Sequence, residues 1–189
     1  MSHRSPVALV KSIAAGALIV TASLLAGCID SSAPILTEAK PMLGERLHLQ
    51  LYSLRSGSAV DPEQVIYVWN GTHYARARGS RNMNDFTVHP FEGGDLIVQT
   101  VPSGRVRSTE YALLHLLMDG VYYVVVIDED DADEATRNAN CAKAGDYACR
   151  VTTREQLFAF ARATAARKKT DGGLAIRLAD EKAPHKRRR

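Results

Sequence analysis

Two apolar stretches joined by a tight turn decide the fold: YALLHLLM at residues 111–118 and VYYVVVI at residues 121–127, with Asp119-Gly120 between them. An Asp-Gly pair between apolar runs is a strong β-hairpin signal, because both turn residues tolerate a positive φ angle. The leucines of the first run also suit a helix, but the β-branched second run needs a strand to pair with. We therefore predict two strands. The second is apolar on both faces, which places it centrally in a sheet with a layer on each side.

Another hairpin is predicted around Asn70-Gly71, which separates two β-rich runs. A two-residue turn there pairs Trp69 with Thr72, so that one face of the hairpin is aromatic and buried. Three more segments have strand character: 47–52, 86–89 and 96–101.

Two helices are predicted in the C-terminal third of the chain. Thr153 and Gln156 form a capping box that opens a helix over residues 154–168, and Asp131 is placed to cap a shorter helix over 131–141. The apolar run 174–178 then returns as a strand. We therefore predict an α+β domain, mostly antiparallel β-sheet built from hairpins, with two C-terminal helices and a final strand.

The N-terminal segment has the pattern of a secretory signal peptide. Arg4 and Lys11 precede an unbroken run of apolar and small residues over 13–26. The run is shorter than the roughly 20 residues that a helix needs to cross a bilayer, so a permanent transmembrane helix fits less well. It ends in Leu25-Ala26-Gly27, directly before Cys28.

This ending resembles the lipobox of bacterial lipoproteins, and the resemblance covers only the first 28 residues. It implies that Cys28 becomes a diacylglyceryl cysteine, that cleavage occurs before it, and that a further chain such as palmitate acylates the new amine. It also implies a cell-envelope protein held to the membrane through lipid and facing the periplasm. Ile29, in place of an aspartate directly after Cys28, favours the outer membrane over the inner. The alternative is an ordinary secreted protein with a chance cysteine.

We divide the chain into a signal peptide (1–27), a lipidated tether (28–44), a single globular domain (45–179) and a disordered basic tail (180–189). Residues 28–181 contain 17 basic and 21 acidic side chains, so the chain's excess of positive charge gives no reason to expect a nucleic-acid partner. The tail either touches anionic lipid headgroups or envelope polymers, or is a solvated terminus.

The remaining cysteines, Cys141 and Cys149, close a short loop. In an oxidising compartment we predict a disulfide between them. A metal site built on these cysteines ranks below it, because no second ligand pair lies nearby in the sequence.

We identify no catalytic residue, cofactor-binding motif or metal-ligand pattern in this sequence. The acidic run 128–134 does not match an EF-hand loop, and the histidines have no zinc-binding spacing. His115, on the central hairpin, is interpreted as a hydrogen-bonded structural residue. We therefore predict an envelope lipoprotein that is a binding protein rather than an enzyme, with a protein or envelope polymer as partner. The alternative is a periplasm-facing enzyme, or a module that binds a small ligand or a metal.

Overall fold

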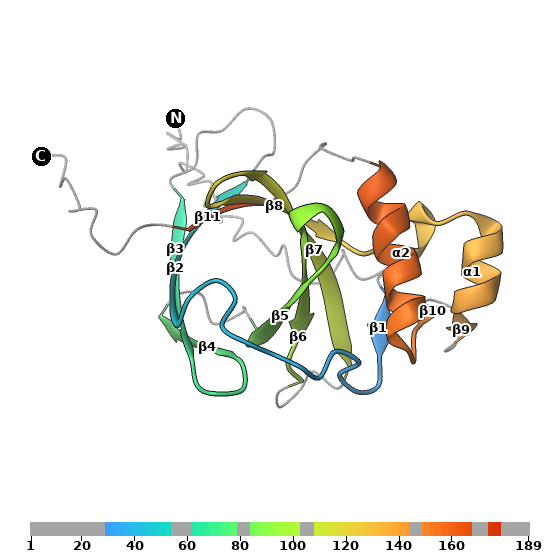
Figure 1. The fold of residues 1–189 in the computed structure, drawn as a ribbon, viewed down its shortest axis with the longest axis horizontal. Helices are drawn as coiled ribbons and strands as arrows, with labels where there is room; N and C mark the ends of the chain where they lie inside the picture. Colours follow the sequence, from blue (N-terminus) through green and yellow to red (C-terminus); the bar gives the residue numbers. More distant parts are fainter. Residues whose placement is uncertain are drawn as a thin grey trace, which may run out of the picture.

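The computed structural model describes residues 29–53, 62–78, 84–102, 108–143, 149–167 and 174–178. The predicted signal peptide, Cys28 and the predicted basic tail lie outside these residues. Within the described part, the chain forms a β-barrel with a smaller helical layer on one flank (Figure 1). No described helix is both long and apolar enough to cross a membrane.

The predicted central hairpin is present. β7 (Thr109–Met118) and β8 (Val121–Val126) run antiparallel, with Leu114 opposite Val124. Gly120 has a φ of 69° in the turn, a conformation that favours glycine. One face of the hairpin packs inside the barrel and the other packs on the helical layer. Both strands are rich in apolar residues because both faces of the hairpin are packed against other parts of the protein.

Eight of the described strands close into an antiparallel barrel. Neighbouring strands follow the order β6-β5-β4-β3-β2-β11-β8-β7, and β7 pairs with β6 to complete the ring. The predicted α+β class and the antiparallel pairing are confirmed, whereas closure into a barrel was not predicted. The remaining barrel strands are β2 (Arg46–Ser53), β3 (Glu63–Trp69), β4 (Tyr74–Arg78), β5 (Phe86–Pro90), β6 (Leu96–Thr100) and β11 (Leu174–Leu178).

The final strand, β11, closes the barrel. The strands from β2 to β8 pair in chain order as a meander, and β11 then fits between β8 and β2. Ile176 accordingly lies opposite both Tyr122 and Leu51. Because an unpaired strand edge leaves backbone hydrogen-bonding groups without partners, pairing on both sides of β11 removes two exposed edges at once.

The hairpin of β3 and β4 has a longer turn than predicted. Trp69 lies opposite Tyr74 rather than Thr72, so residues 70–73 form the connection. The side-chain oxygen of Asn70 accepts hydrogen bonds from the backbone N–H groups of Thr72 and His73, at 3.0 Å each. This local bonding by an Asx side chain stabilises the four-residue turn in place of the two-residue one. The aromatic face of the hairpin is still buried, as predicted.

The helical layer covers the outer face of β6, β7 and β8. η2 (Glu129–Asp131) leads into α1 (Glu134–Asn140), and α2 (Arg154–Arg167) packs beside it. The capping box is confirmed, since Thr153 and Gln156 each accept a hydrogen bond from the other's backbone N–H. The cap of α1 was predicted wrongly: Asp133, not Asp131, accepts from the backbone of the first turn.

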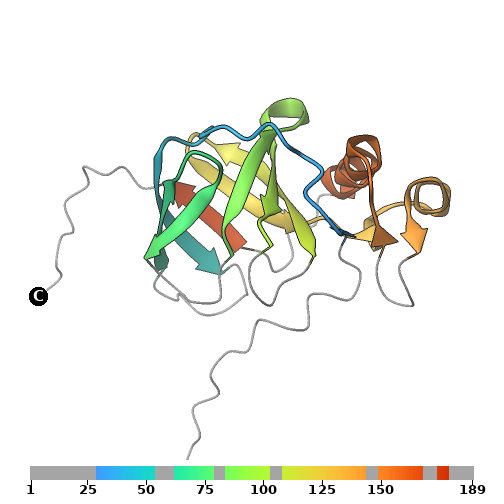
Figure 2. The same ribbon diagram turned by 90° about the horizontal axis from the view of Figure 1, so that it is seen from below.

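Three short strands extend the sheet beside the helices. β1 (Asp30–Ser31) pairs with the start of β7 and with β10 (Cys149–Arg150), which pairs with β9 (Ala142–Lys143). From β1 the chain crosses the outside of the barrel to reach β2, seen as the blue segment in Figures 1 and 2.

The barrel has two ends, the hairpin end and the β1 end. The hairpin end carries the turns that join β3 to β4, β5 to β6 (through η1, Glu92–Gly94) and β7 to β8. At the opposite end β6 finishes, β7 begins and β8 finishes. We call it the β1 end, because β1 pairs there with Thr109 and Glu110. The links between strands at this end (54–61, 79–83, 103–107 and 168–173) lie outside the described residues.

Candidate functional site

The inward-facing side chains of the barrel form one apolar cluster that leaves a cavity of about 210 Å³. An eight-stranded barrel has an interior that side chains either fill or leave open for one small ligand. Here side chains from both halves of the barrel surround an open space. The lining residues are Leu43, Leu47, Leu49, Tyr67, Asn84, Phe86, Val98, Thr100, Ala112, Leu114, Tyr122, Val124, Ile176 and Leu178.

Aromatic rings pack along one side of the interior. The ring centroids of Tyr67 and Phe86 are 4.7 Å apart in an edge-on arrangement, and those of Tyr74 and Phe86 are 5.3 Å apart. Trp69 packs edge-on against Tyr74 at 5.2 Å. Such contacts fix ring orientations more firmly than aliphatic packing does. The wall therefore has a defined shape against which an apolar ligand can pack.

Tyr67 and Tyr74, the fully buried tyrosines of the interior cluster, have their hydroxyl groups satisfied within the protein. Tyr67 donates to the backbone oxygen of Asn84 at 3.1 Å, and Tyr74 donates to the backbone oxygen of Gly44 at 2.9 Å. Burial raises the pKa of Tyr67 to about 12, with Arg76 opposing the shift and two nearby carboxylates adding to it. Burial also raises the pKa of Tyr74. Both phenols are therefore neutral at physiological pH and act as hydrogen-bonded parts of the wall.

The chemistry of the described lining suits binding. It contains no charged side chain, histidine or cysteine, and Thr100 and Asn84 are its polar members besides the tyrosines. The Thr100 hydroxyl accepts a hydrogen bond from the backbone N–H of Glu110 at 2.8 Å. Proton transfer and nucleophilic attack both need a titratable or activated group at the reacting atom. The described lining therefore presents a mainly apolar surface to the cavity.

At the hairpin end, the residues before β2 are held against the barrel interior. Tyr74 is fully buried, and its hydroxyl accepts from the backbone N–H of Leu43 at 3.1 Å while donating to Gly44. These two bonds hold the residues before β2 against the interior cluster, where the Leu43 side chain packs.

Small side chains lie on the inner face toward the β1 end. Thr100 ends β6, and Ala112 lies near the start of β7. Val126, opposite Ala112 and on the same face as Val124, is 40% exposed. Leu116, opposite Tyr122 at the hairpin end, is similarly exposed at 39%, so the described side chains do not make one end more open than the other.

Residues directly after Cys28 belong to the folded domain, which corrects the predicted tether over 28–44. Ile29 is fully buried, and its backbone N–H donates to Ile127 at 3.2 Å. Asp30 accepts two hydrogen bonds from Arg150, at 3.1 and 3.3 Å. These contacts come from residues about 100 and 120 positions away in sequence, so residues 28–44 carry no local signal of them.

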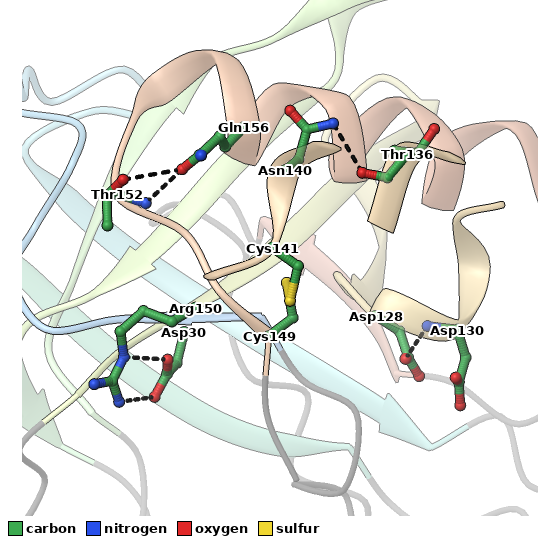
Figure 3. Close-up of a disulfide and its surroundings, with 10 residues drawn as sticks. All are labelled: Asp30, Asp128, Asp130, Thr136, Asn140, Cys141, Cys149, Arg150, Thr152 and Gln156. Carbon is green, nitrogen blue, oxygen red and sulfur yellow. Dashed lines mark hydrogen bonds and ion pairs between the residues drawn. A yellow bond between two sulfur atoms is a disulfide. The ribbon is translucent and has the colours of Figure 1, made fainter. Parts of the chain in front are cut away.

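The predicted disulfide is present and borders β1. Cys141 and Cys149 are bonded, with their Cα atoms 5.1 Å apart, and Figure 3 shows the pair beside Asp30 and Arg150. Glu129 lies close enough to both sulfur atoms to complete a three-ligand group for a metal. Because the two sulfurs are bonded to each other, neither is a thiolate ligand in this state. The predicted lipidation site, Cys28, lies outside the described residues.

The histidines on the described strands have structural partners. His115 Nδ1 lies 2.9 Å from an Asp95 oxygen, as the structural interpretation predicted, and the other oxygen of Asp95 accepts from Leu116 N–H. Burial lowers the pKa of His89, whose ring bonds to Thr87 at 2.9 Å. The first contact ties β6 to β7, and the second lies on the outer face of β5, away from the cavity.

A second hollow of about 420 Å³ lies outside the barrel, between residues 35–42, the end of β5 and the start of α2. Its lining mixes apolar side chains with Glu38, Lys40 and Arg154. The Arg154 guanidinium already packs over the Phe158 ring, 4.8 Å from its centroid. Although this groove is larger, its mixed lining defines no ligand class, and the barrel interior is the stronger candidate.

The cavity was not predicted from the sequence, because it forms only when the sheet closes into a barrel. The alternation of Val98, Thr100 and Ala112 with larger outward residues is visible in the sequence. That these small side chains face a common interior follows only from the register of β6 on β7. Comparisons with protein-family models, curated proteins and solved structures give no match, so the site is interpreted from its own geometry.

Proposed function

We propose that this chain is a lipid-anchored binding protein of the bacterial cell envelope whose barrel holds a small apolar ligand. The observation that carries the proposal is the cavity of about 210 Å³ with an almost wholly apolar lining. A cavity of roughly 150 Å³ lined by leucine, isoleucine and phenylalanine is enough to bind benzene. The barrel interior therefore has room for a somewhat larger apolar group.

The driving force for such a ligand is removal of apolar surface from water, worth roughly 25 cal/mol per Å². Tyr67 and Phe86 offer flat faces, whereas Leu114 and Val124 offer branched ones. Neutral tyrosines and a lining without charge support binding without turnover. This favours the small-ligand alternative of the sequence prediction over a polymer-binding role.

The anchor is the second part of the proposal. Lipidation at Cys28 would hold the domain at the membrane, facing the periplasm, with the outer membrane favoured by Ile29. Two acyl chains or more make such attachment stable, whereas a single chain does not. The membrane is thus the proposed partner of the N-terminus.

Cys28→Ser tests the anchor. In the parent bacterial cell, the variant is expected to accumulate as an unprocessed precursor without lipid, seen as slower migration on a gel and as loss of labelled palmitate. Processing at the normal size with Cys28→Ser would contradict the lipoprotein assignment and leave a secreted protein in its place.

The cavity is tested with a chain that begins at residue 28 and carries Cys28→Ser. All the described core contacts lie within residues 29–178, so this chain keeps both clusters. We expect it to bind the apolar fluorophore N-phenyl-1-naphthylamine with a blue-shifted emission. Ala112→Leu fills the cavity and should weaken binding at least tenfold. The matched control is Ala75→Leu, at an alanine on the outer face of β4, opposite Val68.

Binding that is equal in Ala112→Leu and Ala75→Leu would place the fluorophore outside the barrel and contradict the proposal. Circular dichroism and thermal melting of both variants show whether each is folded. Val98→Phe, at a second lining position, serves if Ala112→Leu does not fold.

A protein partner is a second candidate, favoured by one observation. Leu116, Leu117 and Met118, at the tip of β7, are 39%, 51% and 65% exposed. Large apolar side chains gathered at one tip are typical of contact surfaces. Leu117→Glu should abolish a partner's crosslinking in cells without changing fluorophore binding; unchanged crosslinking would exclude this tip.

A further inference from the structure

The disulfide lies where α1, β10 and η2 meet (Figure 3). Cys141 directly follows α1, and its backbone N–H donates to the carbonyl of Arg137 at 2.9 Å. Cys149 begins β10 and is fully buried. Glu129, the first residue of η2, lies beside both sulfur atoms. Both cysteines pack with the apolar cluster outside the barrel, so an inference from this corner does not depend on the proposed cavity.

One carboxylate oxygen of Glu129 completes a compact set of three donor atoms. This oxygen and the sulfur atoms of Cys141 and Cys149 all lie within 4.8 Å of one another. In a tetrahedral zinc site, with Zn–S distances of about 2.3 Å and Zn–O distances of about 2.1 Å, the ligand atoms are about 3.6 to 3.8 Å apart. The three donors therefore need only small movements to surround one ion, once the sulfurs are no longer bonded to each other.

The Glu129 carboxylate is available for this role. It is partly buried, and within the part of the chain that the structure describes it makes no hydrogen bond or ion pair. The cation whose charge acts on it, Arg137, donates a hydrogen bond to the carbonyl of Ala132 at 2.9 Å. Asp131, in the same turn, already pairs with Arg167 at 2.9 Å. A carboxylate that is partly removed from water is stabilised by a cation at its oxygen atoms.

We infer that reduction of this disulfide creates a Zn²⁺ site. The protein ligands are the thiolates of Cys141 and Cys149 and the carboxylate of Glu129, and water is the fourth ligand. Two thiolates favour zinc over the harder Mg²⁺ and Ca²⁺, and tetrahedral zinc accepts three protein ligands with one water. The cysteine pair then has two states, a disulfide and a metal bridge, and both hold the end of α1 against β10.

The redox step balances with a dithiol as the reductant. The bond between Cys141 and Cys149 breaks as two electrons and two protons pass to its sulfur atoms, and the dithiol becomes a disulfide. Zn²⁺ then displaces both thiol protons to water as the two Zn–S bonds form, because the thiolate is the form that binds metal. A disulfide oxidant reverses the sequence: it takes two electrons from the cysteine thiolates and two protons from water, and the ion is released.

Co²⁺ makes the site visible, because it takes the tetrahedral position of zinc and absorbs light where Zn²⁺ does not. The full chain carries Cys28→Ser, so that Cys141 and Cys149 are its only cysteines, and is purified in mild detergent. A phosphine reduces the disulfide and is removed under argon before Co²⁺ is added. We expect one Co²⁺ per chain, with thiolate-to-cobalt charge-transfer absorption that excess Zn²⁺ abolishes. The chain that has not been reduced should show no such absorption.

The substitution Glu129→Gln tests the third ligand, and Asp130→Asn is the matched control. Each removes one negative charge from η2, but only Glu129 belongs to the donor set. We expect Glu129→Gln to weaken Zn²⁺ binding by the reduced chain at least tenfold and Asp130→Asn to weaken it less than threefold. Competition with a chelator of known zinc affinity provides the measurement.

Absence of charge-transfer absorption in the reduced chain would overturn the inference. Equal zinc affinities in the two variants would overturn it as well, because charge rather than coordination by Glu129 would then explain the binding. A chain that loses its fold on reduction is still informative. Circular dichroism should then show that Zn²⁺ restores the folded spectrum, and does so at a higher concentration in Glu129→Gln. Failure of Zn²⁺ to restore it would overturn the inference. None of these results bears on fluorophore binding or on lipidation, which test the proposed function separately.

Discussion

Single polar side chains set local geometry that the apolar pattern leaves open. Asn70 accepts two backbone N–H groups and so lengthens the β3–β4 turn. Asp133 caps α1, although Asp131 is equally suited by residue type, because its side chain reaches the N–H of Thr136 at 2.7 Å. Asp131 instead pairs with Arg167 of α2. Competition between equivalent residues is settled by tertiary contacts, which explains why such details were predicted wrongly.

The surroundings of Glu110 predict how the free energy of unfolding depends on pH. Burial raises the pKa of its carboxyl above the ordinary 4.5, and the nearby Asp30 carboxylate raises it further. The folded protein therefore holds this proton more tightly than the unfolded chain does. The free energy of unfolding consequently falls as pH rises from the ordinary glutamate pKa through the raised one, and the loss persists above it.

The substitution Glu110→Gln removes this fall in the free energy of unfolding, because glutamine does not ionise. We expect the variant to melt at a higher temperature than the parent protein at pH 7, with a smaller difference at pH 4, where the parent carboxyl is largely protonated. Differential scanning calorimetry at both pH values provides the measurement. A difference that is the same at pH 4 and pH 7 would show that Glu110 does not titrate as its surroundings imply.

Among the elements, β1 has a role that its two residues do not suggest. It joins the N-terminal end of the described chain to β7 and β10, and the Asp30–Arg150 pair holds it in place (Figure 3). The Asp30 side chain is only 16% exposed, so loss of Arg150 would leave a largely buried carboxylate without its ion-pair partner. β1 therefore connects the proposed anchor at Cys28 to the barrel.

Arg150→Met is expected to loosen β1 without unfolding the barrel. Hydrogen exchange at the amides of residues 29–31 should become faster, while exchange in β3 and β4 stays unchanged. Arg162→Met serves as the control, because Arg162 and its partner Glu92 are both more than half exposed and such pairs contribute little. Unchanged exchange at 29–31 in Arg150→Met would mean that backbone pairing alone fixes β1.

At the scale of the whole molecule, the strands and helices followed from local pattern whereas the closed shape did not. Alternation and turn residues identified the hairpins, and the capping box placed α2, because each of these signals lies within a few residues. Closure depends on β6 meeting β7 and on β11 meeting both β8 and β2. Those pairings join distant segments, and no short stretch of sequence records them.

The candidate site was hidden for the same reason. Thr100 and Ala112 look unremarkable as strand residues, yet together they leave the interior unfilled. The predicted tether likewise became part of the fold through contacts with β7 and β10. Cysteine pairing, by contrast, followed from counting, since Cys141 and Cys149 were the pair left after Cys28.

Binding of an apolar ligand inside the barrel can be tested on alternating residues of single strands. Val98, Leu114 and Val124 face the cavity, whereas Ile97, Leu113 and Val125 of the same strands pack on the outer face. Methyl NMR of the soluble chain is recorded while dodecanoic acid is added. We predict that shift changes are concentrated in the inward methyl groups and that their outward neighbours move little. Changes confined to the outward methyl groups, or no changes at saturating ligand, would show that the ligand does not bind inside the barrel.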